Sequence, residues 1–272
     1  TKLLNSHTVV ANYSYQEQPV DRGYANRTLH INLSTKQISE QPVTQQMKDI
    51  FTGGKGFALW LLWNAVESTT RWNDPANAIC IASGPLGGTP IYPGSGKSIV
   101  TSLSPLTGSA IDSNVGGYFG PYLKFSGFDA LQIQGKTSQD TVIYIDGIDG
   151  QVQILAAKGL PDTAYELSDL LTEHFAGGKP RSISVVSAGP GARNTRIGCL
   201  NFTWYDAKRK RARYKQAGRG GIGTVFADKG LKALVVRWDG KDLERLTCPI
   251  GLTGIRGKKA AEILGFTERV EW

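Results

Sequence analysis

The sequence predicts an α+β fold made of two similar halves with short flanking helices. Short apolar segments bounded by glycine and proline, such as 79–82 and 231–236, are typical of β-strands. Fewer segments have helical periodicity, and the clearest amphipathic one spans 163–175. Several short motifs of the first half also recur in the same order in the second half, which indicates a duplicated half-domain.

The expected strands rest on alternation and on turn residues. From residue 27, Leu29, Ile31 and Leu33 alternate with polar residues, which predicts a half-buried strand. Two apolar runs separated by Asp-Gly pairs predict a hairpin at 142–145 and 152–155. In chain order we expect strands at 27–33, 79–82, 98–103, 129–134, 142–145, 152–155, 182–187 and 231–236.

The expected helices come from periodicity and from glycine turns. The segment FALWLLWNAV (57–66) follows a glycine turn at 53–56 and is apolar on all sides, which predicts a buried helix. Further helices are expected at 45–51, 118–125 and 163–175, and a glycine- and proline-rich loop at 86–96.

The expected domain lies at 23–240. Residues 1–22 are polar and show no sustained period, so we expect an N-terminal extension or arm that could dock to a partner. Residues 241–272 lose the pattern of the preceding strands and are expected to be a tail or the start of a missing second domain.

Composition excludes several classes of protein. With 40% hydrophobic and 20% charged residues the chain is globular, and no apolar run is long enough to cross a bilayer. The three cysteines Cys80, Cys199 and Cys248 are widely spaced, which argues against a disulfide framework and for a reducing compartment, the cytoplasm.

The chain is basic, with a formal net charge of +8, and cations gather between Lys208 and Lys215. A basic excess suggests a polyanionic partner, either a phosphorylated cofactor or nucleic acid. A solvated basic loop explains the run equally well. Few aromatic residues lie near it (Trp204, Tyr205 and Tyr214), so nucleic-acid binding is the less favoured interpretation.

The motifs that recur in the two halves of the chain contain glycine turns. IASGP at 81–85 matches VSAGP at 186–190, GYFG at 117–120 matches GGIG at 220–223, and GFDAL at 127–131 matches GLKAL at 230–234. Two such halves would pack about a pseudo-twofold axis, so the equivalent loops 112–117 and 215–220 are expected to face each other across it. Glycine permits close backbone approach and a helix start can bind an anion, so the pair predicts a two-fold, phosphate-bearing ligand. Chance matches between glycine turns are the alternative.

Long ordered motifs resemble one known family. The segments SPLTGSAIDSNVGGYFGPYLKFSGFDALQIQGK (104–136) and AGRGGIGTVFADKGLKALVV (217–236) look like the N-terminal domain of the aldehyde:ferredoxin oxidoreductases, as do GYANRTLHINLSTKQIS and TGGKGFALWLL. The resemblance implies two β-sheets related by a pseudo-twofold axis. It also implies a tungsten (or molybdenum) bis-molybdopterin cofactor whose phosphates are bridged by magnesium, and oxidation of aldehydes to carboxylic acids.

The resemblance further implies partners. A 4Fe-4S cluster would be held by residues outside this chain, and electrons would pass to ferredoxin or to an iron–sulfur electron-transfer subunit. A second chain could carry the remaining domains. None of the three cysteines matches a cluster ligand of the family, and residues after 240 depart from its pattern. An inactive pterin-binding or assembly module is therefore the main alternative to an enzyme.

Site residues follow from the same resemblance. Lys97 fits a basic residue between pterin and cluster, with a surface lysine as the alternative. Asn114 fits a magnesium ligand through its side chain and Gln216 one through its backbone carbonyl; a turn-forming asparagine is the alternative for the former. Catalytic residues are not assigned. The cofactor-binding candidates are Lys97, Asn114, Gly116, Gly117, Lys215, Gln216, Ala217, Gly218 and Arg219.

Overall fold

A computed structural model describes residues 8–16, 18, 20–88 and 95–239 of the 272-residue chain. The first half forms a six-stranded sheet with the order β3-β2-β7-β4-β5-β6. Its elements are β2 (Arg27–Asn32), β3 (Gln37–Pro42), α1 (Gln45–Phe51), α2 (Lys55–Ala65), β4 (Ile79–Ala82), β5 (Ser98–Leu103), β6 (Ala110–Val115), α3 (Phe119–Phe125) and β7 (Ala130–Gln134).

The second half forms a seven-stranded sheet with the order β1-β9-β8-β13-β10-β11-β12. Strand β1 (Val9–Ser14) comes from the start of the chain. The other elements are β8 (Thr141–Asp146), β9 (Gln151–Ala156), α4 (Ala164–Phe175), β10 (Ile183–Ser187), β11 (Leu200–Asp206), β12 (Arg211–Ala217), α5 (Ile222–Asp228) and β13 (Leu231–Arg237), with 3-10 helices at Pro180–Ser182 and Pro190–Asn194.

The two sheets have the same topology. Replacing β2, β3, β7, β4, β5 and β6 by β8, β9, β13, β10, β11 and β12 reproduces the strand order of the second sheet without β1. The strand directions agree as well, because β2 pairs with β7 and β8 with β13 in parallel, whereas the other pairs are antiparallel. The α+β fold with two sheets related by an internal repeat is therefore confirmed.

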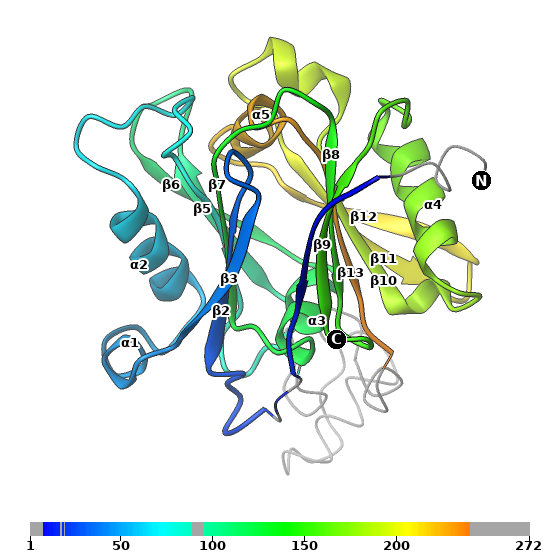
Figure 1. Cartoon of the computed structure of the whole chain (residues 1–272), viewed down its shortest axis with the longest axis horizontal. Coiled ribbons are helices and arrows are strands. Elements are labelled where there is room, and N and C mark those ends of the chain that lie inside the picture. Colours follow the sequence, from blue (N-terminus) through cyan, green and yellow to red (C-terminus); the bar gives the residue numbers. More distant parts are fainter. Residues whose placement is uncertain (1–7, 17, 19, 89–94, 240–272) are drawn as a thin grey trace, which may run out of the picture.

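Helices cover the outer faces of both sheets, and the sheets enclose the main core (Figure 1). Helix α2 packs its Phe57 and Leu61 on the six-stranded sheet, and α4 packs Leu167 and Leu171 on the seven-stranded sheet. Between the sheets, strands of both halves contribute a continuous apolar cluster that includes Ile133. Burial of this core from both sides fixes the relation between the halves.

The short helices α3 and α5 tie the halves together. Helix α3, in the first half, contacts β10, β11 and β13 of the second, and α5, in the second half, contacts β4 and β5 of the first. Phe119 of α3, for example, meets Phe202 edge-to-face with 5.7 Å between ring centroids. This exchange is the packing expected of two halves related by a pseudo-twofold axis.

Local side-chain and backbone chemistry determines where helices α4 and α2 begin. Thr163 caps α4, because its hydroxyl accepts the backbone N–H of Glu166 and donates to the Glu166 carboxylate at 2.8 Å. Gly54 has a positive φ of 55° and directly precedes α2, which begins at Lys55, two residues before the helix expected at 57–66. None of the helices in the described part of the chain is long and apolar enough to cross a membrane.

Two expectations need correction, and two others lie wholly or partly outside the described residues. The arm expected at 1–22 contains β1, whose backbone pairs antiparallel with β9, so Val9–Ser14 belongs to the sheet. The loops expected at 112–117 and 215–220 are partly strands, because β6 runs to Val115 and β12 to Ala217. The tail or second domain expected at 241–272 lies outside the described residues, as does part of the loop at 86–96.

Candidate cofactor site

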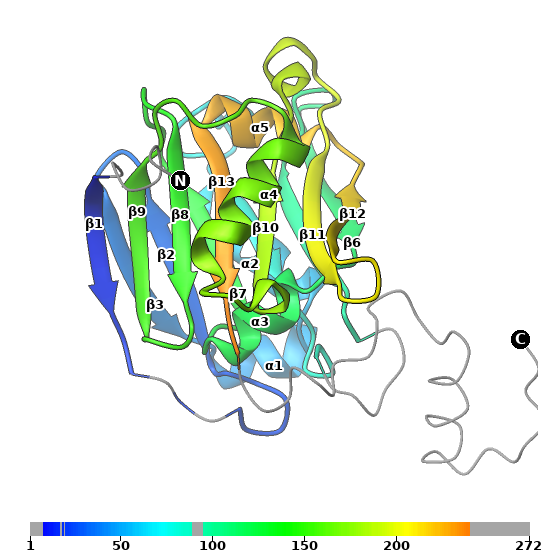
Figure 2. The same cartoon turned by 90° about the vertical axis from the view of Figure 1, so that its right-hand side faces the viewer.

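The repeated segments meet where the two sheets approach each other. Strands β6 and β12 are the last strands of their sheets and lie side by side at one edge of the molecule (Figure 2). The backbone N–H of Arg219 donates to the Ser113 hydroxyl at 3.2 Å, and its Nε donates to the Asp112 carbonyl at 3.1 Å. We call residues 112–117 and 215–220 the β6–β12 junction. The segments predicted to face each other are therefore in direct contact.

Asn114 and Gln216 occupy matching places at this junction. Each is exposed on an edge strand and is followed by a residue buried in the core, Val115 or Ala217. Asn114 lies opposite Ile99, and Gln216 lies opposite Asn201, to which its Nε2 donates at 3.2 Å. The alternation along a strand thus turns both carboxamides outward, and as edge strands β6 and β12 leave alternate backbone groups unpaired by the sheet.

Asp112 contacts cations from two other parts of the fold. Its Oδ1 lies 2.8 Å from Lys55 Nζ at the start of α2 and 3.4 Å from Arg219 Nη2. The acid therefore neutralises one of two cations and fixes the Arg219 side chain. This role of Asp112 was not predicted from the sequence. The only sequence signal for it is a single acidic residue in an otherwise uncharged segment.

Two other cations remain without such an acid. Lys97 is exposed directly before β5, and Lys215 is half-buried on β12. In the part of the chain that the structure describes, neither forms an ion pair with a carboxylate. The edge is therefore positively charged, as a site for phosphates needs to be.

The glycines of the junction have different roles. Gly221 has φ of +71°, and a Cβ there would lie 2.1 Å from the Arg196 carbonyl oxygen, so this glycine is required by packing. Gly220 likewise packs on Ile111. A Cβ on Gly218 would meet no heavy atom within 4 Å, and Gly117 has φ of +116° with only ordinary contacts around it. Gly218 is therefore the open backbone position where a ligand can approach.

The start of α5 does not fit the expected anion site. Ile222 is fully buried, and the N–H of Gly223 already donates to the Gly198 carbonyl at 2.9 Å. Gly218 and Arg219, three or more residues earlier in the chain, are exposed.

The donor set of the junction fits a phosphate-bearing cofactor with a bridging magnesium ion. Asn114 offers a neutral oxygen of the kind that magnesium accepts, and Gly218 leaves the space that a Cβ would fill. Among the described residues there is no group of three or more His, Cys, Asp or Glu side chains that could hold a metal ion. Burial raises the pKa of the Cys80 thiol to about 12, which makes this cysteine unreactive.

Comparisons with known proteins identify the family of the domain. Residues 28–238 match the family model described as aldehyde ferredoxin oxidoreductase, N-terminal domain. Tungsten-containing aldehyde ferredoxin oxidoreductases of Pyrococcus horikoshii and Pyrococcus abyssi are 34% and 33% identical over 215 residues, which covers 79% of this chain and 33% of each relative. The chain thus spans about a third of the length of these relatives.

A solved structure has the same fold. It is the active site complex BamBC of benzoyl coenzyme A reductase in complex with 1,5 dienoyl-CoA, with a TM-score of 0.69 and 28% sequence identity. The match covers 79% of this chain and 31% of that one. The duplicated two-sheet fold and these matches together show that the chain belongs to the family of aldehyde ferredoxin oxidoreductase N-terminal domains.

Proposed function

We propose that this chain is the cofactor-carrying domain of a tungsten bis-molybdopterin oxidoreductase that oxidises aldehydes to carboxylic acids. The relatives named tungsten-containing aldehyde ferredoxin oxidoreductases support the metal and the substrate class. The observation that carries the proposal is the β6–β12 junction, where both halves of the repeat present an outward carboxamide beside cations.

Residues of the junction would hold the cofactor by its phosphates. Arg219 and Lys215 would supply positive charge, and Gly116, Gly117, Ala217 and Gly218 would let the backbone approach. The Asn114 side chain and the Gln216 carbonyl would hold the magnesium ion. Asp112 keeps Arg219 in place through its contacts at 3.1 and 3.4 Å, so little side-chain entropy is lost when an anion binds. When bound, the cofactor supplies the two-electron exchange with the substrate.

Lys97 is the residue of this chain proposed to assist electron transfer. Its exposed ammonium group can donate hydrogen bonds both to a pterin and to a neighbouring 4Fe-4S cluster held by residues outside this chain. A positive charge there stabilises added electron density. Electrons would then leave one at a time to ferredoxin or to an iron–sulfur subunit, and a second chain could carry the remaining domains.

The phosphate role is tested by Arg219→Ala in the protein purified anaerobically with its partners. Loss of a charge-assisted contact of this kind costs about 1.5–3 kcal/mol, so we expect cofactor retention after gel filtration to fall on the order of tenfold or more. Arg211→Ala is the matched control, because Arg211 is an exposed arginine at the start of β12, outside the junction. Equal molybdopterin content in both variants would contradict the proposal.

A further inference from the structure

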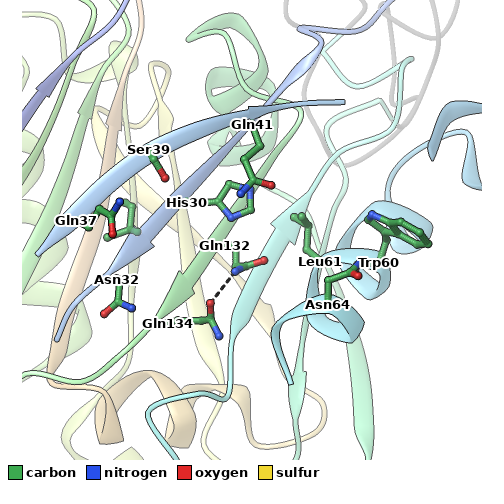
Figure 3. Close-up of a pocket in the computed structure, with 11 residues that line it drawn as sticks. His30, Asn32, Gln37, Ser39, Gln41, Trp60, Leu61, Asn64, Gln132 and Gln134 are labelled. Carbon is green, nitrogen blue, oxygen red and sulfur yellow. Dashed lines mark hydrogen bonds between the residues drawn. The ribbon is translucent and has the colours of Figure 1, made fainter. Parts of the chain in front are cut away.

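A polar pocket lies on the outer face of the six-stranded sheet, at the edge opposite to the β6–β12 junction. Its volume is about 630 Å³, and side chains of β2, β3 and β7 line one side while α2 lines the other (Figure 3). None of its lining residues is Asp, Glu, Lys or Arg. Six of them carry a side-chain carboxamide: Asn32, Gln37, Gln41, Asn64, Gln132 and Gln134.

Strand register gathers these groups into rows. On one face of the sheet, His30 of β2 lies opposite Ser39 of β3 and Gln132 of β7. The next row, two residues along β2, places Asn32 opposite Gln37 and Gln134. Because strand residues two apart lie about 6.6 Å apart on one face, the rows form a continuous polar floor.

The same positions are different in the other half of the repeat. There β8 pairs with β13, so Tyr144 stands for His30 and Val235 for Gln132, while Leu155 stands for Gln41. All three belong to the apolar cluster beneath α4, and Tyr144 stacks on Phe175 with ring centroids 4.1 Å apart. The second half thus covers these three positions with an apolar core. In the next row, Asn32 and Gln134 correspond to Asp146 and Arg237, which form an ion pair at 3.0 Å.

Some of these polar residues are unfavourable in the interior strands that carry them. Strands β2 and β7 lie inside the sheet, where asparagine is disfavoured and valine and tyrosine are preferred. The second half shows that this fold accepts tyrosine at the position of His30 and valine at that of Gln132. Local departures from such preferences are expected where residues serve a ligand.

Part of the floor is held by the protein and part is available. Gln132 donates to Gln134 at 2.9 Å, and Gln134 donates to the Ala76 carbonyl at 2.8 Å, so these carboxamides are fixed in place. No hydrogen bond within the described part of the chain engages the side chains of Ser39 and Gln41. Fixed and available groups together make a pre-formed polar surface.

The pocket is also uncharged. Burial lowers the pKa of His30, whose Nε2 lies 2.8 Å from the Thr28 hydroxyl, so the imidazole is neutral at pH 7. Carboxamides, a hydroxyl and a neutral imidazole all combine donor and acceptor capacity. Groups of this kind match hydroxyl groups, which also donate and accept, and they offer no counter-charge for an ionised ligand.

We propose that this pocket binds a neutral polyhydroxylated small molecule, such as a sugar or a cyclitol, at a site separate from the cofactor. The aromatic ring of Trp60 and the carboxamide of Asn64, four residues apart on α2, form the wall opposite the sheet. The carboxamides of the sheet can form hydrogen bonds with the hydroxyl groups of a polyol, and the Trp60 ring on the opposite side can pack on its apolar C–H groups.

The proposal is tested by calorimetric titration of the full chain with glucose, sucrose and myo-inositol. Gluconate and glucose 6-phosphate serve as charged analogues. We expect at least one neutral probe to bind saturably with a Kd of about 1 mM or below. Gluconate and glucose 6-phosphate should bind at least about tenfold more weakly than that probe. No saturable binding of any neutral probe, or tighter binding of a charged one, would overturn it.

The variants are taken from the other half of the repeat. Gln41→Leu with Gln132→Val installs the residues of the second half and removes two hydrogen-bonding groups, so affinity should fall on the order of tenfold. Gln41→Leu alone, at an exposed position, keeps the test valid if the double variant does not fold. Gln153→Leu, which makes the same change on β9, is the matched control and should bind as the parent does. Unchanged affinity in both pocket variants would contradict the assignment.

Discussion

Two buried lysines donate hydrogen bonds to backbone carbonyls of glycine turns. The ammonium group of Lys124, near the end of α3, donates to the Gly84 carbonyl, and that of Lys229, directly after α5, donates to the Gly135 carbonyl at 3.1 Å. Both side chains are almost fully buried. Burial disfavours the charged form and lowers the pKa of each lysine to about 8.

These pKa values predict how stability depends on pH. Above pH 8 the folded protein releases these protons, whereas the unfolded chain keeps them up to the ordinary lysine pKa of 10.5. The unfolded state then binds more protons, so the free energy of unfolding should rise by about 1–2 kcal/mol per lysine between pH 8 and 9.5. Urea denaturation measures it, and Lys124→Met should remove about half of the rise. A free energy that falls over this range would contradict the prediction.

Asn114 and Lys97 are predicted to differ in what they support. Asn114→Ala removes a proposed magnesium ligand, so tungsten and molybdopterin content should fall. Lys97→Ala removes a charge beside the path of the electrons, so aldehyde-dependent reduction of ferredoxin should slow while cofactor content stays near the parent value. Both quantities are measured on the same anaerobic preparations. Full tungsten occupancy in Asn114→Ala would exclude the magnesium role, and loss of the cofactor in Lys97→Ala would make Lys97 a structural anchor.

At the level of elements, most interior strands could be predicted, whereas the edge strands and the interior strand β11 could not. The apolar runs at β4, β10 and β13 were found because both of their faces are buried. Strands β3, β6 and β12 were missed, since they carry polar and charged residues with little alternation and two of them end a sheet at the junction. The site residues were identified by family resemblance, but the Asp112–Arg219 contact joins residues far apart in sequence and needs the fold.

The junction turn separates glycines needed for folding from the one proposed for the ligand. Gly221→Ala forces a Cβ against the Arg196 carbonyl at a positive φ, so thermal unfolding should show a loss of about 1–3 kcal/mol or more. Gly218→Ala meets open space and should leave stability nearly unchanged. If the cofactor approaches this backbone, Gly218→Ala should still lower cofactor content. A Gly218→Ala protein with parent stability and full cofactor content would contradict that approach.

At the scale of the whole molecule, an apolar surface remains beside α2. A groove of about 410 Å³ there is lined only by apolar residues apart from the indole nitrogens, and Trp63 on it is 79% exposed. The groove reaches Leu103 and Ala110, at the turn that leads into β6. Surfaces of this kind usually belong to interfaces, and the relatives are about three times as long as the match. We expect further domains of the enzyme to cover it.

The most direct test is the metal and phosphorus content of the protein purified anaerobically from its own host, with every co-purifying polypeptide identified. We expect tungsten or molybdenum, with two molybdopterins per metal and magnesium. We also expect the domains that hold an iron–sulfur cluster, either on a continuation of this chain or on a companion chain. A folded protein with neither metal nor molybdopterin, and with no cluster-carrying partner, would contradict the claim that the β6–β12 junction carries the cofactor.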